Sequence, residues 1–164
     1  MIDLRALQTP LKAKYKEDPA SAKLTLHARG RASKADVSCK IESGLGKVTA
    51  GLHPYTGGDG SFACSGDMLL EALVGCAGVT LSAVATAMSI ELRSAVVSAE
   101  GDLDFRGTLG VAKDAPVGFS AIRLVFELAT DDQVKKLASL TERYCVVYQT
   151  LAKSAALETI TRRS

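Results

Sequence analysis

The amino-acid sequence predicts an α+β fold with mostly antiparallel strand pairing. Three observations support this class: several short segments alternate apolar and polar residues, one long segment over 68–90 is almost entirely apolar, and a later segment has helical spacing. In chain order the elements are strands, a long helix, strands, a helix and a last strand. At 164 residues, we expect a single domain over 1–164, in which about 1–20 form an N-terminal extension or short helix.

The first part of the chain is predicted to contain one helix and three strands. Residues 4–16 form a helix with a polar face, and Pro19 ends it. The period-two alternation of apolar residues predicts half-buried strands over 22–30, 35–41 and 47–53. The glycine-containing segment 42–47 predicts a hairpin turn between the last two of these strands, and 54–67 is predicted to be a loop.

The part that follows the apolar segment is predicted to return to strands. Residues 93–107 form an extended strand, and 119–129 show the clearest alternation of apolar and charged residues. A helix then begins, with Thr130 as its N-cap and acidic residues in its first turn. A short helix over 146–155 and a terminal strand over 157–162 complete the prediction.

The charge and composition argue against a nucleic-acid partner. The formal net charge of +2 comes from 20 basic and 18 acidic residues spread along the chain, and only 5% of residues are aromatic. A nucleic-acid surface instead gathers its basic residues on one face. The 47% hydrophobic and 23% charged residues are typical of an ordinary globular protein.

The N-terminus and the cysteines favour a reducing, cytoplasmic location. Residues 1–19 carry charges throughout and lack the apolar core of an export signal. In the cytoplasm the four cysteines are not expected to form structural disulfides. No two of them are spaced as CxxC, and His27 and His53 are the only histidines, so we expect no metal and no other cofactor.

The apolar segment Met68–Ile90 is predicted to be a long buried helix. It is long enough to cross a hydrocarbon layer of about 30 Å. However, Glu71 lies inside it, and the acidic Asp67 and Glu91 flank it where a membrane-spanning helix favours Lys or Arg. A helix that is apolar on every side is otherwise one buried in a protein core. We therefore expect no membrane partner.

Cys76 lies inside this helix and admits two interpretations. A buried cysteine usually packs as a small hydrophobic residue. A reactive Cys76 receives no help from the N-terminus of its own helix, because that field fades within the first turn. Since burial alone raises a thiol pKa, a reactive Cys76 needs a cationic or hydrogen-bonding neighbour from elsewhere in the chain.

The segment SGDMLLEALVGCAGVTL contains Cys76, and the later segment ERYCVVYQTL contains Cys145. Together they resemble the OsmC/Ohr family of osmotically inducible and organic-hydroperoxide-resistance proteins, over about residues 24–161. The resemblance implies strongly bent antiparallel sheets that wrap two central helices. It also implies an intertwined homodimer with its sites near the subunit interface.

The resemblance further implies a thiol-dependent peroxidase that reduces organic hydroperoxides. The thiolate of Cys76 would attack the peroxide and become a sulfenic acid, and Cys145 would condense with it to a disulfide. An external dithiol would reduce that disulfide. The alternative is a non-catalytic OsmC-like protein that binds a small apolar ligand at the dimer cleft; a third interpretation is a stress-response structural protein with inert thiols.

The chain departs from the family pattern at the groups that activate the thiolate. Peroxidases of the family carry a Glu ten residues before the reactive cysteine, and this Glu pairs with an Arg that holds the thiolate. The position of the Glu is Gly66 here, and the Arg has two candidates, Arg29 and Arg31. The Pro that usually follows the second cysteine is Val146. The cysteine pair thus carries over, whereas the activating pair does not.

Two further cysteines and the two histidines complete the candidates. Cys39 is expected to pack within a strand. Cys64 lies in the predicted glycine-rich loop, where it is either incidental or an alternative resolving thiol for Cys76. His27 and His53 are expected on strands or at the surface, and His53 is a remote candidate for thiol activation.

Overall fold

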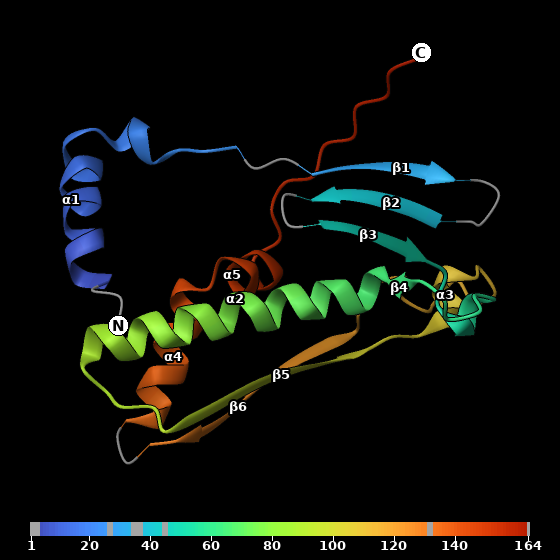
Figure 1. Cartoon of the computed structure of the whole chain (residues 1–164). Helices are drawn as coiled ribbons and strands as arrows, with labels where there is room; N and C mark the ends of the chain where they lie inside the picture. Colours follow the sequence, from blue (N-terminus) through green and yellow to red (C-terminus); the bar gives the residue numbers. More distant parts are fainter. Residues whose placement is uncertain (1–3, 26–27, 34–37, 44–45, 131–132, 164) are drawn as a thin grey trace. The chain divides into compact units, whose positions relative to one another are not determined.

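The computed structural model describes residues 4–25, 28–33, 38–43, 46–130 and 133–163 (Figure 1). The chain divides into two compact units, a first unit of 1–71 with 99–124 and a second unit of 72–98 with 125–164. Helices and small sheets both occur in the described residues, and the predicted α+β class is confirmed.

The first unit begins with the predicted helix. Helix α1 spans Leu4–Glu17, and a short 3-10 helix, η1, follows over Pro19–Ala22. The carboxylate of Asp18 accepts a hydrogen bond from the N–H of Ala20 at 3.1 Å. Because Asp18 caps η1 and Pro19 occupies its first turn, the chain stops α1 here, as the sequence predicts.

A four-stranded sheet with the order β1-β2-β3-β4 follows in the first unit. Its strands are β1 (Arg29–Ser33), β2 (Ser38–Ser43), β3 (Gly46–Gly51) and β4 (Ala63–Cys64). The first three pair antiparallel, and the register Ser43↔Gly46 confirms the predicted hairpin. The strand predicted over 22–30 is wrong in its first half, because 22 belongs to η1 and 23–25 form no strand. Cys39 lies in β2; the predictions for its side chain and for His27 lie outside the described residues.

The segment predicted as a loop over 54–67 contains two short elements. A 3-10 helix, η2, spans Pro54–Thr56, and β4 pairs parallel with β3 in the register Gly51↔Cys64. Cys64 therefore lies in a strand and not in a loop. A Cβ added to Gly51 would lie 2.8 Å from the Cβ of Phe62, so the bare glycine is what lets the chain return this close to β3.

Helix α2 spans Ser65–Met88, which confirms the long helix but starts it three residues earlier than the apolar segment suggests. It ends before Ser89, whose φ of 57° is left-handed. Its buried residues are spaced four apart and form one stripe: Leu73, Ala77, Leu81 and Ala85. Val79 is 73% exposed, so the prediction of burial on every side is wrong for the described chain. By length and hydropathy alone, α2 would pass as a membrane span, a test that core helices of water-soluble proteins also pass.

Strands β5 (Ser94–Asp102) and β6 (Ala121–Ala129) form a two-stranded sheet. The N–H of Arg93 donates to the carbonyl of Ala129 at 3.0 Å, and the N–H of Ser120 donates to that of Asp102 at 2.9 Å. The start of β5 thus lies beside the end of β6, which makes the pair antiparallel. The predicted strand over 93–107 stops early because α3 (Phe105–Thr108) begins there.

The second unit has the most deeply buried core of the described residues. Helix α4 (Val134–Tyr144) places Leu137 against Leu81 and Ala85 of α2, and Phe126 and Leu128 of β6 pack around them. The N-cap of α4 is Gln133 in a left-handed conformation, so the prediction of Thr130 as N-cap is wrong.

The C-terminal end of the chain follows α5 (Val146–Ala152), which confirms the predicted short helix. Residues 154–163 form no strand, so the predicted terminal strand over 157–162 is wrong. Leu157 is 96% exposed there, although its alternation with polar neighbours is that of a half-buried strand. A strand needs a neighbour to pair with, and the structure gives this segment none among the described residues.

Candidate functional site

The second unit brings together the two cysteines that the sequence singles out. Cys76 lies on α2, three residues after the buried Leu73. Cys145 joins α4 to α5. Cys145 is fully buried and Cys76 partly so. The Cys145 thiol lies within hydrogen-bonding reach of the Cys76 sulfur, and both thiols are reduced.

Cys145 is held rigidly because it caps two helices at once. It is the C-cap of α4 and the N-cap of α5, with an extended backbone (φ −74°, ψ 112°) between them. Its N–H donates to the carbonyl of Thr141 at 2.8 Å, and its carbonyl accepts from the N–H of Gln149 at 2.9 Å. Its sulfur accepts from the N–H of Tyr148 at 3.5 Å. The thiol therefore has a fixed place at the start of α5.

The surroundings of Cys76 favour its ionised form. Burial raises the pKa of the Cys76 thiol, but hydrogen bonds outweigh this effect and the pKa lies below its ordinary value. The donors, in order of their effect, are the N–H of Val147, the thiol of Cys145, the N–H of Val146 and the hydroxyl of Thr80. Helix N-termini are known to activate cysteines in this way, because their first N–H groups have no partner within the helix.

The pKa of Cys145 moves in the opposite direction. Burial raises the pKa of the Cys145 thiol, and the hydrogen bond to Cys76 and the negative charge of its sulfur raise it further. The N–H of Tyr148 only partly offsets this. When the pair loses its first proton, Cys76 is therefore the group that ionises more readily, and Cys145 keeps its proton to higher pH.

No described cationic side chain contributes to the low pKa of Cys76. Arg29 is exposed on β1, and the side chain of Arg31 lies outside the described residues. Gly66 is the second residue of α2. A reactive Cys76 requires a cationic or hydrogen-bonding neighbour. Hydrogen bonds, mainly from the backbone of α5, take that place.

The remaining sequence candidates belong to the first unit. Cys64 and His53 line a pocket there, and neither is among the groups that alter the pKa of Cys76. Within the described ranges, no three His, Cys, Asp or Glu side chains gather closely enough to hold a metal ion.

The fold and the thiol pair together define an α+β protein with a paired-cysteine site, and comparison with known proteins identifies its family. A family model described as OsmC-like protein matches residues 58–160. The chain therefore belongs to the OsmC-like family. Among curated proteins, a sequence search found no match.

Solved structures share this fold. An OsmC-like protein from Mycoplasma pneumoniae has a TM-score of 0.66 at 18% identity, over 80% of this chain and 90% of that one. An organic hydroperoxide resistance protein OsmC from Legionella pneumophila has a TM-score of 0.63 at 16% identity, over 80% and 92%. A putative organic hydroperoxide resistance protein from Vibrio cholerae, with captopril bound in one of its active sites, has a TM-score of 0.59 at 17% identity, over 81% and 88%. At these identities the likeness establishes the fold alone.

Proposed function

We propose that this protein is a thiol-dependent peroxidase that reduces organic hydroperoxides through Cys76 and Cys145. The observation that carries the proposal is the placement of two reduced thiols within hydrogen-bonding reach of each other, with the N–H groups at the start of α5 beside the Cys76 sulfur. A peroxidatic cysteine must be a thiolate, because the thiolate is the nucleophile. A resolving cysteine must stay close and keep its proton until it is needed. The lowered pKa of Cys76 supports the first role, and the raised pKa of Cys145 supports the second.

In the first step, the Cys76 thiolate attacks one oxygen of the hydroperoxide. A new S–O bond forms as the O–O bond breaks, the sulfur is oxidised to a sulfenic acid, and the organic group leaves as an alkoxide that takes up a proton to become an alcohol. The N–H groups of Val146 and Val147 hold the thiolate before attack. These two N–H groups position the Cys76 thiolate and stabilise its negative charge, and the step needs no cofactor.

In the second step, the Cys145 thiol condenses with the sulfenic acid. An S–S bond forms between the two cysteines and one water leaves. Because the two thiols already lie within hydrogen-bonding reach, this step requires only a local shift where Cys145 joins α4 and α5. An external dithiol then reduces the disulfide by exchange and is itself oxidised.

The organic nature of the substrate is supported by family membership. The Legionella relative is described as an organic hydroperoxide resistance protein. A cycle that ends in a disulfide needs a supply of reduced dithiol, which suits the cytoplasm.

We further propose that the protein works as an intertwined homodimer whose bent sheets wrap two central helices. Two exposed features support a second copy. The face of α2 opposite its buried stripe exposes Val79 and Gly75, and the tail after α5 exposes Leu157 and Ile160, 96% and 68% of their surfaces. A single domain over 1–164, with α1 and η1 as an N-terminal extension, completes the proposed architecture.

The test is turnover of cumene hydroperoxide by the reduced protein with a dithiol as reductant. We expect turnover, with a Cys76–Cys145 disulfide trapped when the dithiol is omitted. Cys76→Ser should abolish turnover, and Cys145→Ser should stop it after one equivalent with a sulfenic acid at Cys76. If the Cys76 thiol survives excess peroxide unchanged, the protein is not a peroxidase. The alternative of a non-catalytic OsmC-like protein that binds an apolar ligand, which Gly66 favours by replacing the family Glu, then takes its place.

A further inference from the structure

The first unit contains a pocket of about 470 Å³, and neither Cys76 nor Cys145 is among its lining residues. Its lining includes four aromatic residues together with one thiol and one carboxylate: His53, Tyr55, Phe105, Phe119, Cys64 and Asp67. A cavity of this size, mostly apolar and with a few polar groups, is typical of small-molecule sites. All of its lining residues belong to the first unit.

The rings of three lining residues pack against one another. His53 stacks on Phe105 with 4.8 Å between ring centres and 20° between planes, and Tyr55 meets Phe105 edge to face at 5.3 Å. The Nδ1 of His53 accepts the N–H of Tyr55 at 3.1 Å, which fixes the imidazole. Because each ring is held by another, this wall of the pocket is already formed without a ligand.

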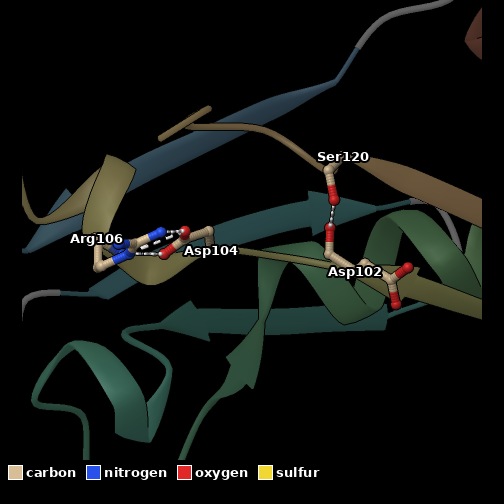
Figure 2. A network of polar contacts seen from close by, with 4 residues as sticks. All are labelled: Asp102, Asp104, Arg106 and Ser120. Atoms are coloured by element: carbon tan, nitrogen blue, oxygen red, sulfur yellow. Dashed lines mark hydrogen bonds and ion pairs between the residues drawn. The ribbon is translucent and has the colours of Figure 1, made fainter. Parts of the chain in front are cut away.

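Three polar contacts lie next in sequence to two of these aromatic residues, near the end of β5 (Figure 2). Asp104 caps α3 by accepting the N–H of Arg106 at 3.0 Å, and its carboxylate also binds the Arg106 guanidinium, so Phe105 between them is held in place. The Ser120 hydroxyl donates to the carbonyl of Asp102 at 3.1 Å. This contact secures the residue next to Phe119.

Two glycines shape the space beside Phe119. A Cβ on Gly101 would lie 2.5 Å from the ring of Phe119, so this ring rests directly on the bare backbone of β5. A Cβ on Gly66 would lie 3.5 Å from the same ring and 3.6 Å from the sulfur of Cys64, which is ordinary contact. A side chain longer than Ala at position 66 would therefore grow into the pocket, and glycine keeps it open.

The charge of the pocket comes from Asp67. No Lys or Arg is among the described lining residues, and Asp67 forms no ion pair with any described residue. The neighbouring acids differ in this respect, since Asp102 binds Arg123 and Asp104 binds Arg106. The N-terminus of α2 offsets only about half an elementary charge. The pocket therefore presents a negative charge beside aromatic faces, and both attract cations.

We propose that this pocket binds a small organic cation with a flat or apolar body. The ammonium or guanidinium group faces the Asp67 carboxylate, and the body lies against Phe105 and Phe119. The partly buried Cys64 thiol lines the same space and provides a reporter, because a bound ligand shields it from alkylation.

The test uses three probes of similar shape and different charge on the full chain: benzylammonium, benzyl alcohol and benzoate. The rate of iodoacetamide labelling is measured separately at Cys64 and Cys76 by peptide mass spectrometry. We expect benzylammonium to protect Cys64 at concentrations roughly tenfold lower than benzyl alcohol, and benzoate to give no protection. Labelling of Cys76 is recorded in the same samples, so that a probe that slows all thiol labelling alike is recognised. Equal protection by all three probes, or by none, would overturn the proposal.

Two variants separate charge from shape. Asp67→Asn should remove the preference for benzylammonium over benzyl alcohol, whereas Asp114→Asn, which removes a charge from an exposed residue outside the pocket, should keep it. Gly66→Leu should abolish protection by filling the pocket. Circular dichroism and thermal unfolding verify that each variant is folded. A preference that persists in a folded Asp67→Asn protein, or protection that persists in a folded Gly66→Leu protein, contradicts the proposed site.

Discussion

The Cys145 thiol lies against the Cys76 sulfur, and this contact lowers the pKa of Cys76 while it helps to raise that of Cys145. One hydrogen bond thus moves the pKa values of two chemically identical groups in opposite directions. The division of roles in the proposed cycle follows from their places in the fold: Cys76 on the side of α2 and Cys145 at the start of α5.

Removal of the Cys145 donor should make Cys76 less reactive. In Cys145→Ala the hydrogen bond is lost, so the pKa of Cys76 rises and the iodoacetamide labelling rate of Cys76 at neutral pH falls, by about tenfold if the bond contributes one pKa step. Cys145→Ser keeps a donor at the same place and serves as the matched control. A pH profile of the labelling rate checks this, since the rate falls as pH drops through the pKa. Identical profiles for Ala and Ser would show that the contact does not tune Cys76.

The raised pKa of Cys145 should appear as a loss of stability at alkaline pH. In the unfolded chain this thiol ionises near its ordinary value of about 8.5. Because the folded protein keeps the proton to higher pH, the unfolded state binds fewer protons and the free energy of unfolding falls as pH rises above that value. Urea unfolding of Cys76→Ser between about pH 8 and pH 10 measures the part of this effect that burial causes, because the charge of the Cys76 sulfur is then absent. The Cys76→Ser, Cys145→Ser double variant is the control, and an equal decline in both proteins would contradict the prediction.

The core of the second unit should depend on Leu137. Its side chain is fully buried between α2 and β6, so Leu137→Ala leaves a cavity and should lower the free energy of unfolding by about 2–5 kcal/mol. Val134, one turn earlier on α4, is 42% exposed, and Val134→Ala should cost about 1 kcal/mol or less. Urea unfolding measures both. Similar losses for the two variants would mean that the α4 core contact is not a main source of stability.

Elements with strong local signals were predictable from the sequence. The apolar run that forms α2 and the alternation that forms β6 each specify a type of element, because burial demands those periods. Residues 157–162 have the same alternation but form no strand. A strand depends on a pairing partner, and the local pattern does not describe one. The start of α4 at the left-handed Gln133 also lacks a local signal, because glutamine has no special preference for that conformation.

The site was predictable only in part. The expectation that Cys76 and Cys145 form a pair came from the resemblance to a family, because no periodicity relates residues so far apart. The N–H groups that lower the pKa of Cys76 were missed. A signal for them existed: a cysteine directly before a predicted helix implies that the next two N–H groups point out of the helix without partners. The sequence does not indicate that Cys76 of α2 lies beside these N–H groups.

Val146 offers the sharpest test of this backbone activation. It is the first residue of α5, where proline is well tolerated because its fixed φ suits the first helical turn. Val146→Pro removes one N–H donor to the Cys76 thiolate and should leave α5 intact. We expect the pKa of Cys76 to rise and its labelling rate at neutral pH to fall several-fold, since hydrogen bonds to charged groups contribute about 1.5–3 kcal/mol and this donor is one of four.

Val146→Ala is the matched control, because it shortens the same exposed side chain and keeps the N–H. Its pH profile for Cys76 labelling should coincide with that of the unmodified protein. Circular dichroism and urea unfolding verify that α5 survives in both variants. If Val146→Pro is folded and its profile also coincides with the unmodified one, backbone donors at the start of α5 do not activate Cys76, and the low pKa must then depend on the Cys145 thiol.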